Sequence, residues 1–413
     1  MKKPELLSPI QDFTSLHSAI ENKADAVYFG VQGFNMRAGA KNFAVKDLKK
    51  IVKICHNSKV KCYLALNTII YENELLKVEK ILKSAKLAGI DAIICWDMAI
   101  IKLAKKLNLE IHLSTQASIS NSTALEQYKK LGIKRVVLAR ECDLDDIKKI
   151  KKKIKIKLET FIHGAMCVSV SGRCFLSQYL YNKSANRGEC LQPCRRKYSI
   201  TQTDFTDIKT EKSLELGEDY VLSPKDLCTL PFIEKLIEAG IDVFKIEGRN
   251  RSPEYVATVT KVYRQAIDFY TENKKTIKQK NTLNKFNKLK KQLLQELKKV
   301  YNRGFSSGFY LGQPINQWTY SYGSQATQKK IHLGKVNHYY SKIKVAEILI
   351  KANKILKLKD TIQFQGETTG VFEQKINSIE INHKKIKSAK QNDLIAVQVN
   401  KKVRKGDEVY KIV

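Results

Sequence analysis

The feature that most constrains the fold is a regular alternation of short β-rich runs with amphipathic helical segments over the first 250 residues. The β-rich runs are mostly apolar, which is typical of parallel strands covered by helices on both faces. Eight of them occur, at residues 5–8, 25–30, 60–67, 91–97, 110–116, 135–140, 157–164 and 243–248. Eight strands with helices between them predict an α/β fold, the (β/α)8 TIM-like barrel. A doubly wound open sheet is the alternative, but no glycine-rich phosphate turn follows the first run.

Three of the predicted helices end in similar turns. Residues 88–91 read Ala-Gly-Ile-Asp, residues 131–134 read Leu-Gly-Ile-Lys, and residues 239–242 read Ala-Gly-Ile-Asp. A glycine just after a helix can take the left-handed conformation that returns the chain toward the next strand. These turns therefore support the alternation of helix and strand.

The spacing of the runs also predicts the domain organisation. The connection between the seventh and eighth runs is far longer than usual, and its residues 164–228 carry five of the nine cysteines. Beyond residue 331, short alternating runs are separated by glycine turns, which is typical of a small all-β barrel. We predict a catalytic barrel with this insertion over 1–265, a basic helical and linker segment over 266–330, and a β-barrel over 331–413.

The chain has 75 basic and 41 acidic residues, a formal net charge of +34. Such a charge attracts polyanions, and the attraction weakens as salt is added. However, 63 of the basic residues are lysines and only 12 are arginines, a bias that an AT-rich genome produces without any partner. No apolar run approaches the ~20 residues of a membrane span, and the start of the sequence lacks an apolar signal core. We expect a cytoplasmic protein.

Four cysteines lie within 28 residues at the spacing Cys-x6-Cys-x15-Cys-x3-Cys: Cys167, Cys174, Cys190 and Cys194. Cys228 follows further on. Thiolates gathered in this way bind Zn²⁺ or a [4Fe–4S] cluster. Zinc ribbons normally use two closely spaced cysteine pairs, and only one such pair is present, so the spacing favours the cluster. Thiols without a shared role are the remaining alternative.

Residues 159–177 read Glu-x-Phe-x-x-Gly-Ala-Met-Cys-x4-Gly-x-Cys-x-Leu-Ser, which resembles the signature of the peptidase U32 family. Residues 223–228, 245–249 and 302–309 are also similar to family segments. The resemblance covers essentially the whole chain and is strongest to members that modify tRNA. It implies oxygen-independent hydroxylation of wobble uridine to 5-hydroxyuridine, with tRNA as the partner, prephenate as co-substrate and a [4Fe–4S] cluster as cofactor. Hydroxylation of rRNA cytidine and a role as a cluster-bearing accessory factor are alternatives within the family.

The resemblance leaves the fourth cluster ligand open. Cys167, Cys174 and Cys190 belong to most family ligand sets, whereas the fourth ligand is either Cys194, favoured by proximity, or Cys228. The family name also raises peptidase activity. The sequence lacks His-Glu-x-x-His and Gly-x-Ser-x-Gly motifs, although His163 and Cys167 could form a dyad. A thiolate bound to metal would not be available as a nucleophile.

The catalytic residues of such a barrel lie at the carboxyl ends of its strands. Polar residues predicted to ring this mouth are Tyr28, Arg37, Asn67, Gln116, Arg140, Glu141, His163, Glu247 and Arg249. We assign His163, Glu247, Gln116 and Asn67 to the catalytic site. Because prephenate carries two carboxylates, it calls for bidentate arginines. The candidates for that anion site are Arg37, Arg140, Arg173, Arg187 and Arg249.

RNA would dock on the lysine-rich segment 271–300, which holds ten lysines and two acids, and on the domain at 331–413. A solvated helix surface is the alternative explanation for the lysines. The sequence leaves the oligomeric state open.

Overall fold

The structure is a computed structural model that describes residues 3–413 apart from 171–172, 199–204, 207–212, 215–219, 221, 313, 315–316 and 322. Its larger part is a parallel sheet that closes on itself. The strands are β1 (Glu5–Pro9), β2 (Ala26–Gly30), β3 (Lys61–Ala65), β4 (Ala92–Cys95), β5 (Ile111–Leu113), β6 (Arg135–Val137), β7 (Lys157–Gly164) and β11 (Val243–Ile246). Strand β11 pairs in parallel with both β7 and β1, so the eight strands form the predicted barrel.

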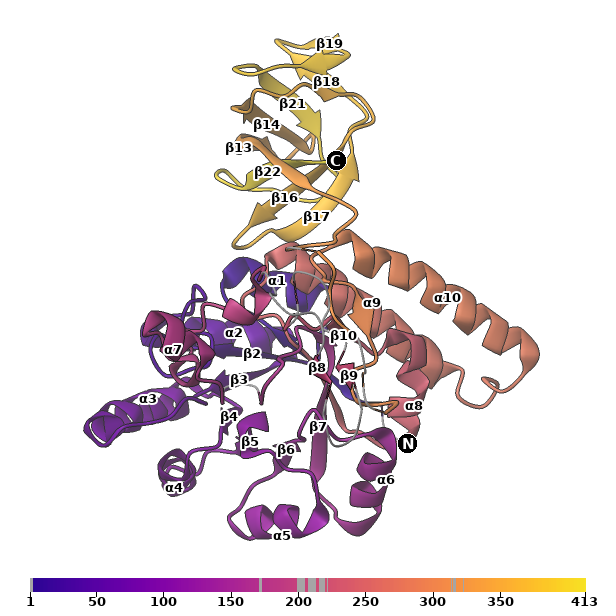
Figure 1. Cartoon of the computed structure of the whole chain (residues 1–413). Coiled ribbons are helices and arrows are strands. Elements are labelled where there is room, and N and C mark those ends of the chain that lie inside the picture. Colours follow the sequence, from indigo (N-terminus) through magenta and orange to yellow (C-terminus); the bar gives the residue numbers. More distant parts are fainter. Residues whose placement is uncertain are drawn as a thin grey trace.

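Helices surround these strands (Figure 1). They are α1 (Phe13–Glu21), α2 (Leu48–Asn57), α3 (Leu75–Ala88), α4 (Met98–Lys106), α5 (Ser122–Lys130), α6 (Leu144–Lys153), α8 (Ile233–Glu238) and α9 (Pro253–Glu272). Their apolar faces and the outward side chains of the strands form one large buried cluster. A helix buries a stripe and a strand buries alternate residues, so this packing accounts for the apolar runs seen in the sequence. None of the helices in the described part of the chain has the length and apolarity needed to cross a membrane.

The turns predicted after the helices include a repeated stabilising contact at the amino ends of the strands. Gly89 and Gly240 have φ of +85° and +76°, in the left-handed region. Asp91 and Asp242 follow two residues later, and Asp25 occupies the equivalent place before β2. Each aspartate accepts a hydrogen bond of 2.8 Å from a backbone N–H of the neighbouring strand. Each also contacts one basic side chain, namely Arg264 for Asp25, His56 for Asp91 and Lys151 for Asp242.

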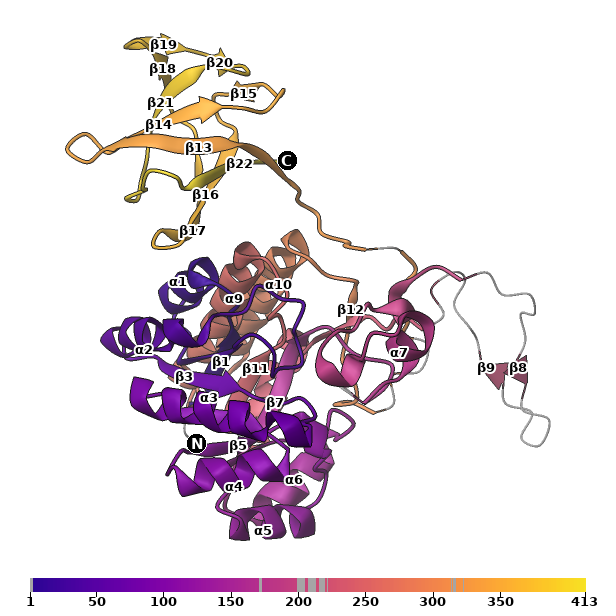
Figure 2. The same cartoon turned by 90° about the vertical axis from the view of Figure 1, so that its left-hand side faces the viewer.

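The segment between β7 and β10 (Asp226–Cys228), residues 165–225, is called the insertion below. Its helix α7 (Leu176–Tyr181) projects from one end of the barrel, on the same side as β8 (Phe205–Thr206) and β9 (Ser213–Leu214) (Figure 2). Strand β10 pairs antiparallel with β7 and parallel with β12 (Phe305–Ser306), extending the sheet outside the barrel. Cys228, which we predicted at the end of the insertion, therefore lies in a strand of this sheet.

Helix α10 (Lys280–Lys299) packs against the barrel. Phe286 of α10 stacks on Phe269 of α9 with ring centroids 5.3 Å apart. Leu293 and Leu297 of the same helix are buried in the large core. The predicted boundaries at 265 and 330 remain predictions.

The C-terminal part is an antiparallel β domain with its own core. Its strands are β13 (Lys330–Tyr340), β14 (Val345–Ile350), β15 (Leu356–Lys357), β16 (Thr361–Gly366), β17 (Gly370–Lys375), β18 (Ile379–Ile381), β19 (Lys384–Ile386), β20 (Ser388–Ala389), β21 (Leu394–Gln398) and β22 (Glu408–Ile412). Eight of them form one antiparallel sheet with β17 and β19 as its outer strands, so the predicted C-terminal all-β domain is present. The domain rests on α1 and α9 through Lys401–Glu21 and Lys330–Glu254 ion pairs.

Candidate active site at the mouth of the barrel

A small cavity opens at the carboxyl ends of the barrel strands. Seven of the predicted site residues line it: Tyr28, Arg37, Asn67, Gln116, Arg140, Glu247 and Arg249. Met36, Ser114, Thr115, Phe161 and Lys245 complete much of the wall. The cavity volume is about 30 Å³, which holds about two water molecules. A larger ligand would enter only if side chains at the rim move.

The rim of the cavity carries an ion pair. Arg37 donates to Glu247 Oε1 from Nη2 at 3.0 Å and from Nε at 3.3 Å. Burial raises the pKa of Glu247, but Arg37, Arg140 and Arg249 outweigh it and hold that pKa at about 2. Glu247 is therefore a carboxylate at neutral pH, and it raises the pKa of Arg37 in turn. With its side chain 26% exposed, Arg37 is the part of this pair that faces solvent.

Two further arginines of the cavity have no carboxylate at bonding distance among the described residues. Arg249 is 5% exposed, and its Nη1 donates to Asn35 Oδ1 at 3.1 Å. Arg140 donates to the backbone oxygen of Ala165 at 2.7 Å and lies 4.1 Å above the Phe161 ring. In both arginines Nε is buried and, within the described part of the chain, unpaired. Burial, together with the neighbouring Arg37 charge, lowers the pKa of Arg249 to about 10.

The floor of the cavity is a buried ionic layer. Lys245 Nζ lies 2.7 Å from Glu159 Oε1, and Arg135 contacts Glu159 at 3.3 Å and Glu5 at 2.8 Å. Burial opposes ionisation of Glu159, but Lys245 and Arg135 lower its pKa. Glu159 thus balances Lys245, while Glu247 balances Arg37. The positive charges of Arg140 and Arg249 are left over, so the cavity favours an anion.

The cysteines of the insertion lie close enough to the cavity to interact with it electrostatically. Burial and the neighbouring Cys167 and Cys174 raise the pKa of Cys190, whereas Arg37 opposes the shift. Burial, then Cys167, Cys190 and Cys174, raise the pKa of Cys194. Cys167 and Cys190 are exposed, and the other two are partly exposed. Cys167 and Cys190 therefore lie near Arg37 of the cavity, and Cys174 and Cys194 lie near those two cysteines.

Cys228 has different surroundings. It is buried in β10 opposite His163 of β7, and Tyr263 Oη donates to its Sγ at 3.8 Å. Burial raises its pKa to about 11, and the other groups that act on it are Tyr263, Asp226 and a backbone N–H. Cys228 is thus a thiol of the packed sheet.

The sequence of this chain matches a known protein family. Residues 11–320 match peptidase family U32. The chain belongs to the peptidase U32 family. It is 43% identical to an uncharacterized protease of Methanocaldococcus jannaschii and 40% identical to a collagenase of Porphyromonas gingivalis, each match covering 98% of this chain and 97% of the relative. It is 35% identical to tRNA hydroxylation protein P1 of Bacillus subtilis, over 92% of this chain and 87% of that protein.

These U32 relatives carry different names, so membership of the family does not by itself determine the reaction. Within the U32 signature at 159–177, Glu159 supports the cavity floor, Phe161 lines the wall and Cys167 and Cys174 belong to the thiol group. The signature therefore joins the cavity to the cysteines.

The structure does not bring His163 of the U32 signature to the cavity. His163 is 2% exposed, its Nδ1 lies 3.3 Å from Tyr263 Oη, and burial lowers its pKa to about 3. Glu159 and Phe161 of β7 face the barrel interior, so strict alternation of side chains along this strand would have pointed His163 inward as well. A register shift makes His163 pair with Ile246, directly after the pairing of Phe161 with Lys245. Such a bulge reverses the faces of the residues that follow it, so His163 packs against α9.

Two of the predicted anion-site arginines also lie outside the cavity lining. Arg187 forms an ion pair with Glu74 and lies 4.7 Å from the centroid of the Tyr71 ring. Arg173 lies 5.1 Å from the centroid of the Trp96 ring. Both belong to the outer surface around the insertion.

Two residues that our sequence reasoning did not assign to the site support it. Asn35 is fully buried, and its Oδ1 accepts from the backbone N–H of Arg37 at 3.0 Å as well as from Arg249. A lone asparagine in a loop gives no sequence signal for this role. Lys245 of β11 lies two residues before Glu247, and both line the cavity. Residues two apart on a strand share a face, so this spacing could have identified Lys245 as a site residue.

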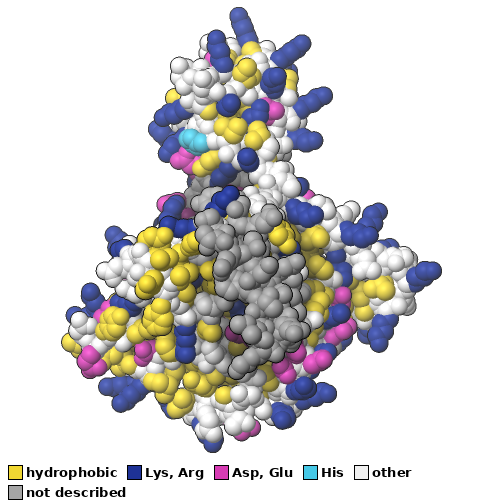
Figure 3. Space-filling view, in the orientation of Figure 1, with side chains coloured by type: hydrophobic (Ala, Val, Ile, Leu, Met, Phe, Trp, Pro, Cys, Tyr) yellow, Lys and Arg dark blue, Asp and Glu magenta, His cyan; other side chains and the backbone are white. Residues whose placement is uncertain are grey.

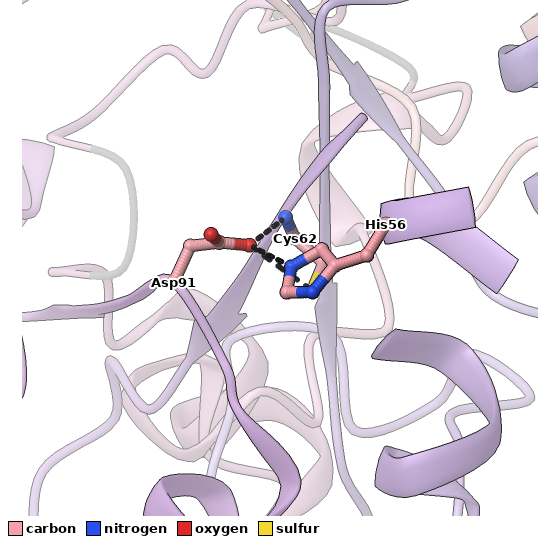
Figure 4. Close-up of side chains that lie close together, drawn as sticks. All are labelled: His56, Cys62 and Asp91. Carbon is pink, nitrogen blue, oxygen red and sulfur yellow. Dashed lines mark hydrogen bonds and ion pairs between the residues drawn. The ribbon is translucent and has the colours of Figure 1, made fainter. Parts of the chain in front are cut away.

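A second group of side chains could in principle hold a metal ion. Ligand atoms of His56, Cys62 and Asp91 lie within 4.8 Å of one another, as Figure 4 shows. Asp91 Oδ2 contacts His56 Nε2 at 3.0 Å and accepts from the backbone N–H of Cys62 at 2.8 Å. Asp25 and Asp242 make equivalent contacts, since each accepts a hydrogen bond from a strand N–H and pairs with one basic side chain, Arg264 or Lys151 respectively. We therefore interpret His56 as the basic partner of Asp91 in a repeated structural contact.

Proposed function

We propose that this chain hydroxylates wobble uridine of tRNA to 5-hydroxyuridine without oxygen, using prephenate as co-substrate and a [4Fe–4S] cluster as cofactor. The observation that carries the proposal is the anion-favouring cavity next to four gathered thiols. Its two unbalanced cations, Arg140 and Arg249, match the charge of a dicarboxylate. The likeness to tRNA hydroxylation protein P1 over 92% of the chain supports the same assignment.

The cavity residues have separate roles in this proposal. Arg249 and Arg140 bind the two carboxylates, because guanidinium groups pair with carboxylates through two parallel hydrogen bonds. Asn67 and Gln116 also line the cavity and offer amide groups there. Glu247 holds Arg37 at the rim, and movement of Arg37 enlarges a cavity that otherwise holds only water. The uracil must leave its stack to reach this mouth, as unpaired loop bases do.

The thiols fit the proposed cofactor by their chemistry and grouping. Burial and the neighbouring thiols disfavour ionisation of Cys190 and Cys194, and bound iron would remove that penalty. When bound, the cluster supplies the redox or Lewis-acid chemistry that these side chains lack. The cavity residues of the chain then bind and orient the co-substrate next to it.

Nucleoside mass spectrometry of tRNA tests the proposal. The chain is expressed in a bacterial strain that lacks its own tRNA uridine hydroxylation. Wild type should restore 5-hydroxyuridine, Arg249→Met should abolish it, and Lys102→Met, which removes an exposed charge on α4, should leave it unchanged. Absence of 5-hydroxyuridine with cluster-loaded wild-type protein would refute the proposal.

The ligand set has its own test in anaerobically purified protein. Cys194→Ser should lose iron and the visible absorbance of the cluster, whereas Cys228→Ser should keep both. The reverse result would assign Cys228 as the fourth ligand. Wild type without bound iron after anaerobic reconstitution would contradict the cofactor assignment.

Peptidase activity is the alternative, because relatives at about 40% identity carry protease names. The surroundings of the suggested dyad weigh against it. Cys167 is exposed while His163 is buried and bonded to Tyr263, so the imidazole is poorly placed to take the thiol proton. Cleavage of gelatin that is lost in Cys167→Ser and unaffected by iron removal would favour the peptidase.

A further inference from the structure

The insertion exposes an unusual number of large apolar side chains near the mouth of the barrel. They are Val168, Val170, Phe175, Tyr179, Leu180, Tyr181 and Leu191. Phe175 and Tyr179 are 73% and 87% exposed. They lie four residues apart, and the backbone N–H of Tyr179 donates to the Phe175 carbonyl at 2.8 Å, so the two rings share one side of α7. Figure 3 shows hydrophobic side chains gathered on this side of the molecule.

The same segment is strongly basic. Residues 167–198 contain six lysines and arginines and one acidic residue. Three of the arginines lie over aromatic rings: Arg173 over Trp96 at 5.1 Å, Arg187 over Tyr71 at 4.7 Å and Arg196 over Tyr181 at 4.4 Å. Exposed rings mixed with arginines are typical of surfaces that bind single-stranded nucleic acid, where bases stack and phosphates meet cations. The excess of six basic residues over one acidic residue favours a polyanion as the partner.

We propose that this surface, which we call the α7 platform, binds the unpaired nucleotides of an RNA loop. Bases stack on Phe175 and Tyr179, while Arg196 and Lys183 neutralise phosphates. The proposal rests on the proposed function, since it supplies the docking site for the RNA substrate. The α7 platform adds to the RNA contacts expected of α10 and the C-terminal domain. Its ligand is a single-stranded loop, because the stacked bases of a duplex leave no face free for the exposed rings.

The α7 platform is fixed to the cavity through the loop after β2. At Gly188, φ is +87°, and an added Cβ would lie 2.3 Å from the backbone oxygen of Asn35. The insertion thus packs tightly on the segment that provides Met36 and Arg37 to the cavity. A loop held on α7 therefore lies next to the mouth, where one of its bases can be turned inward.

Fluorescence anisotropy with labelled RNA tests the platform without relying on catalysis. The probes are a short stem-loop with a uridine-containing single-stranded loop and a fully paired duplex of the same composition. We expect wild type to prefer the stem-loop. The double variant Phe175→Ala/Tyr179→Ala should bind the stem-loop more weakly by roughly thirtyfold or more, since each of two stacked bases loses about fivefold or more, with little change for the duplex. Phe175→Tyr/Tyr179→Phe should keep the wild-type affinity.

The control is Leu87→Ala, which removes an equally exposed apolar side chain (80%) at the opposite end of the barrel and should bind like wild type. Unchanged stem-loop affinity in the double alanine variant would overturn the platform while leaving the proposed function intact. An unchanged affinity combined with loss of self-association in sedimentation would instead identify the surface as a contact between copies of the chain. Failure of wild type to bind either RNA would count against both proposals.

Discussion

The sharpest consequence of the cavity concerns Arg249, whose buried charge has no carboxylate at bonding distance among the residues that the structure describes. Burial, with Arg37 nearby, lowers its pKa from 12.5 to about 10. At 1.36 kcal/mol per pKa unit, the charged form is disfavoured in the folded state by about 3 kcal/mol. This cost is fully present at neutral pH, where the group is protonated in both states, and it is relieved only as the pH rises above 10. The buried Arg249 charge thus lowers the free energy of unfolding, and this loss keeps a cation at the site.

Arg249→Met removes the charge and keeps an apolar chain of similar length. It also removes the hydrogen bond to Asn35, which costs about 1.5 kcal/mol. Asn35 keeps its bond to the backbone N–H of Arg37, so its buried oxygen stays satisfied. The net expectation is that the free energy of unfolding of the barrel rises by about 1–2 kcal/mol, while the affinity for a dicarboxylate falls at least tenfold.

Urea unfolding followed by far-UV circular dichroism measures this change. The helices of the described residues all lie before residue 300, so the helical signal reports the barrel rather than the C-terminal domain. Prephenate should raise the unfolding midpoint of wild type and leave that of Arg249→Met unchanged. A variant destabilised by 1 kcal/mol or more would show that Arg249 is a structural residue, and the assignment of the anion site would fail.

Three other expectations follow from the described contacts. Glu159→Gln leaves Lys245 facing a neutral amide in the buried floor, so unfolding in urea should become easier by about 3–5 kcal/mol; a loss below 1 kcal/mol would contradict the ionic layer. Glu247 has a folded pKa of about 2, below its unfolded value, so its contribution of about 3 kcal/mol is present above pH 4.5 and lost as the pH falls toward 2. Acid titration of stability should therefore be shallower in Glu247→Gln, and an identical titration would argue against the Arg37 pair. If His56 is only the basic partner of Asp91, EDTA should affect the unfolding midpoints of wild type and His56→Ala equally, whereas a midpoint lowered in wild type alone would establish a metal at this group.

Much of the fold and part of the site could be predicted from local sequence patterns. Apolar runs located the eight barrel strands because a strand covered on both faces has few polar positions. The carboxyl ends of those strands then identified Tyr28, Asn67, Gln116 and Glu247 as residues of one cavity. Lys245 was missed although it has the same alternation, and Asn35 gave no local signal at all.

Tertiary structure alone decided which predicted residues meet. A bulge between β7 and β11 turned His163 away from the cavity, and a sequence shows the alternation of a strand but not where a partner strand breaks it. Glu74 holds Arg187 on the outer surface, although the two are 113 positions apart. Proximity in the sequence favoured Cys194 over Cys228 as the fourth cluster ligand only slightly. Packing puts Cys194 near the other three thiols and Cys228 inside the sheet. The sequence by itself thus determined the elements and their ends, because these depend on neighbouring residues. Charge balance in the cavity depended on contacts between distant segments, and only the folded chain creates them.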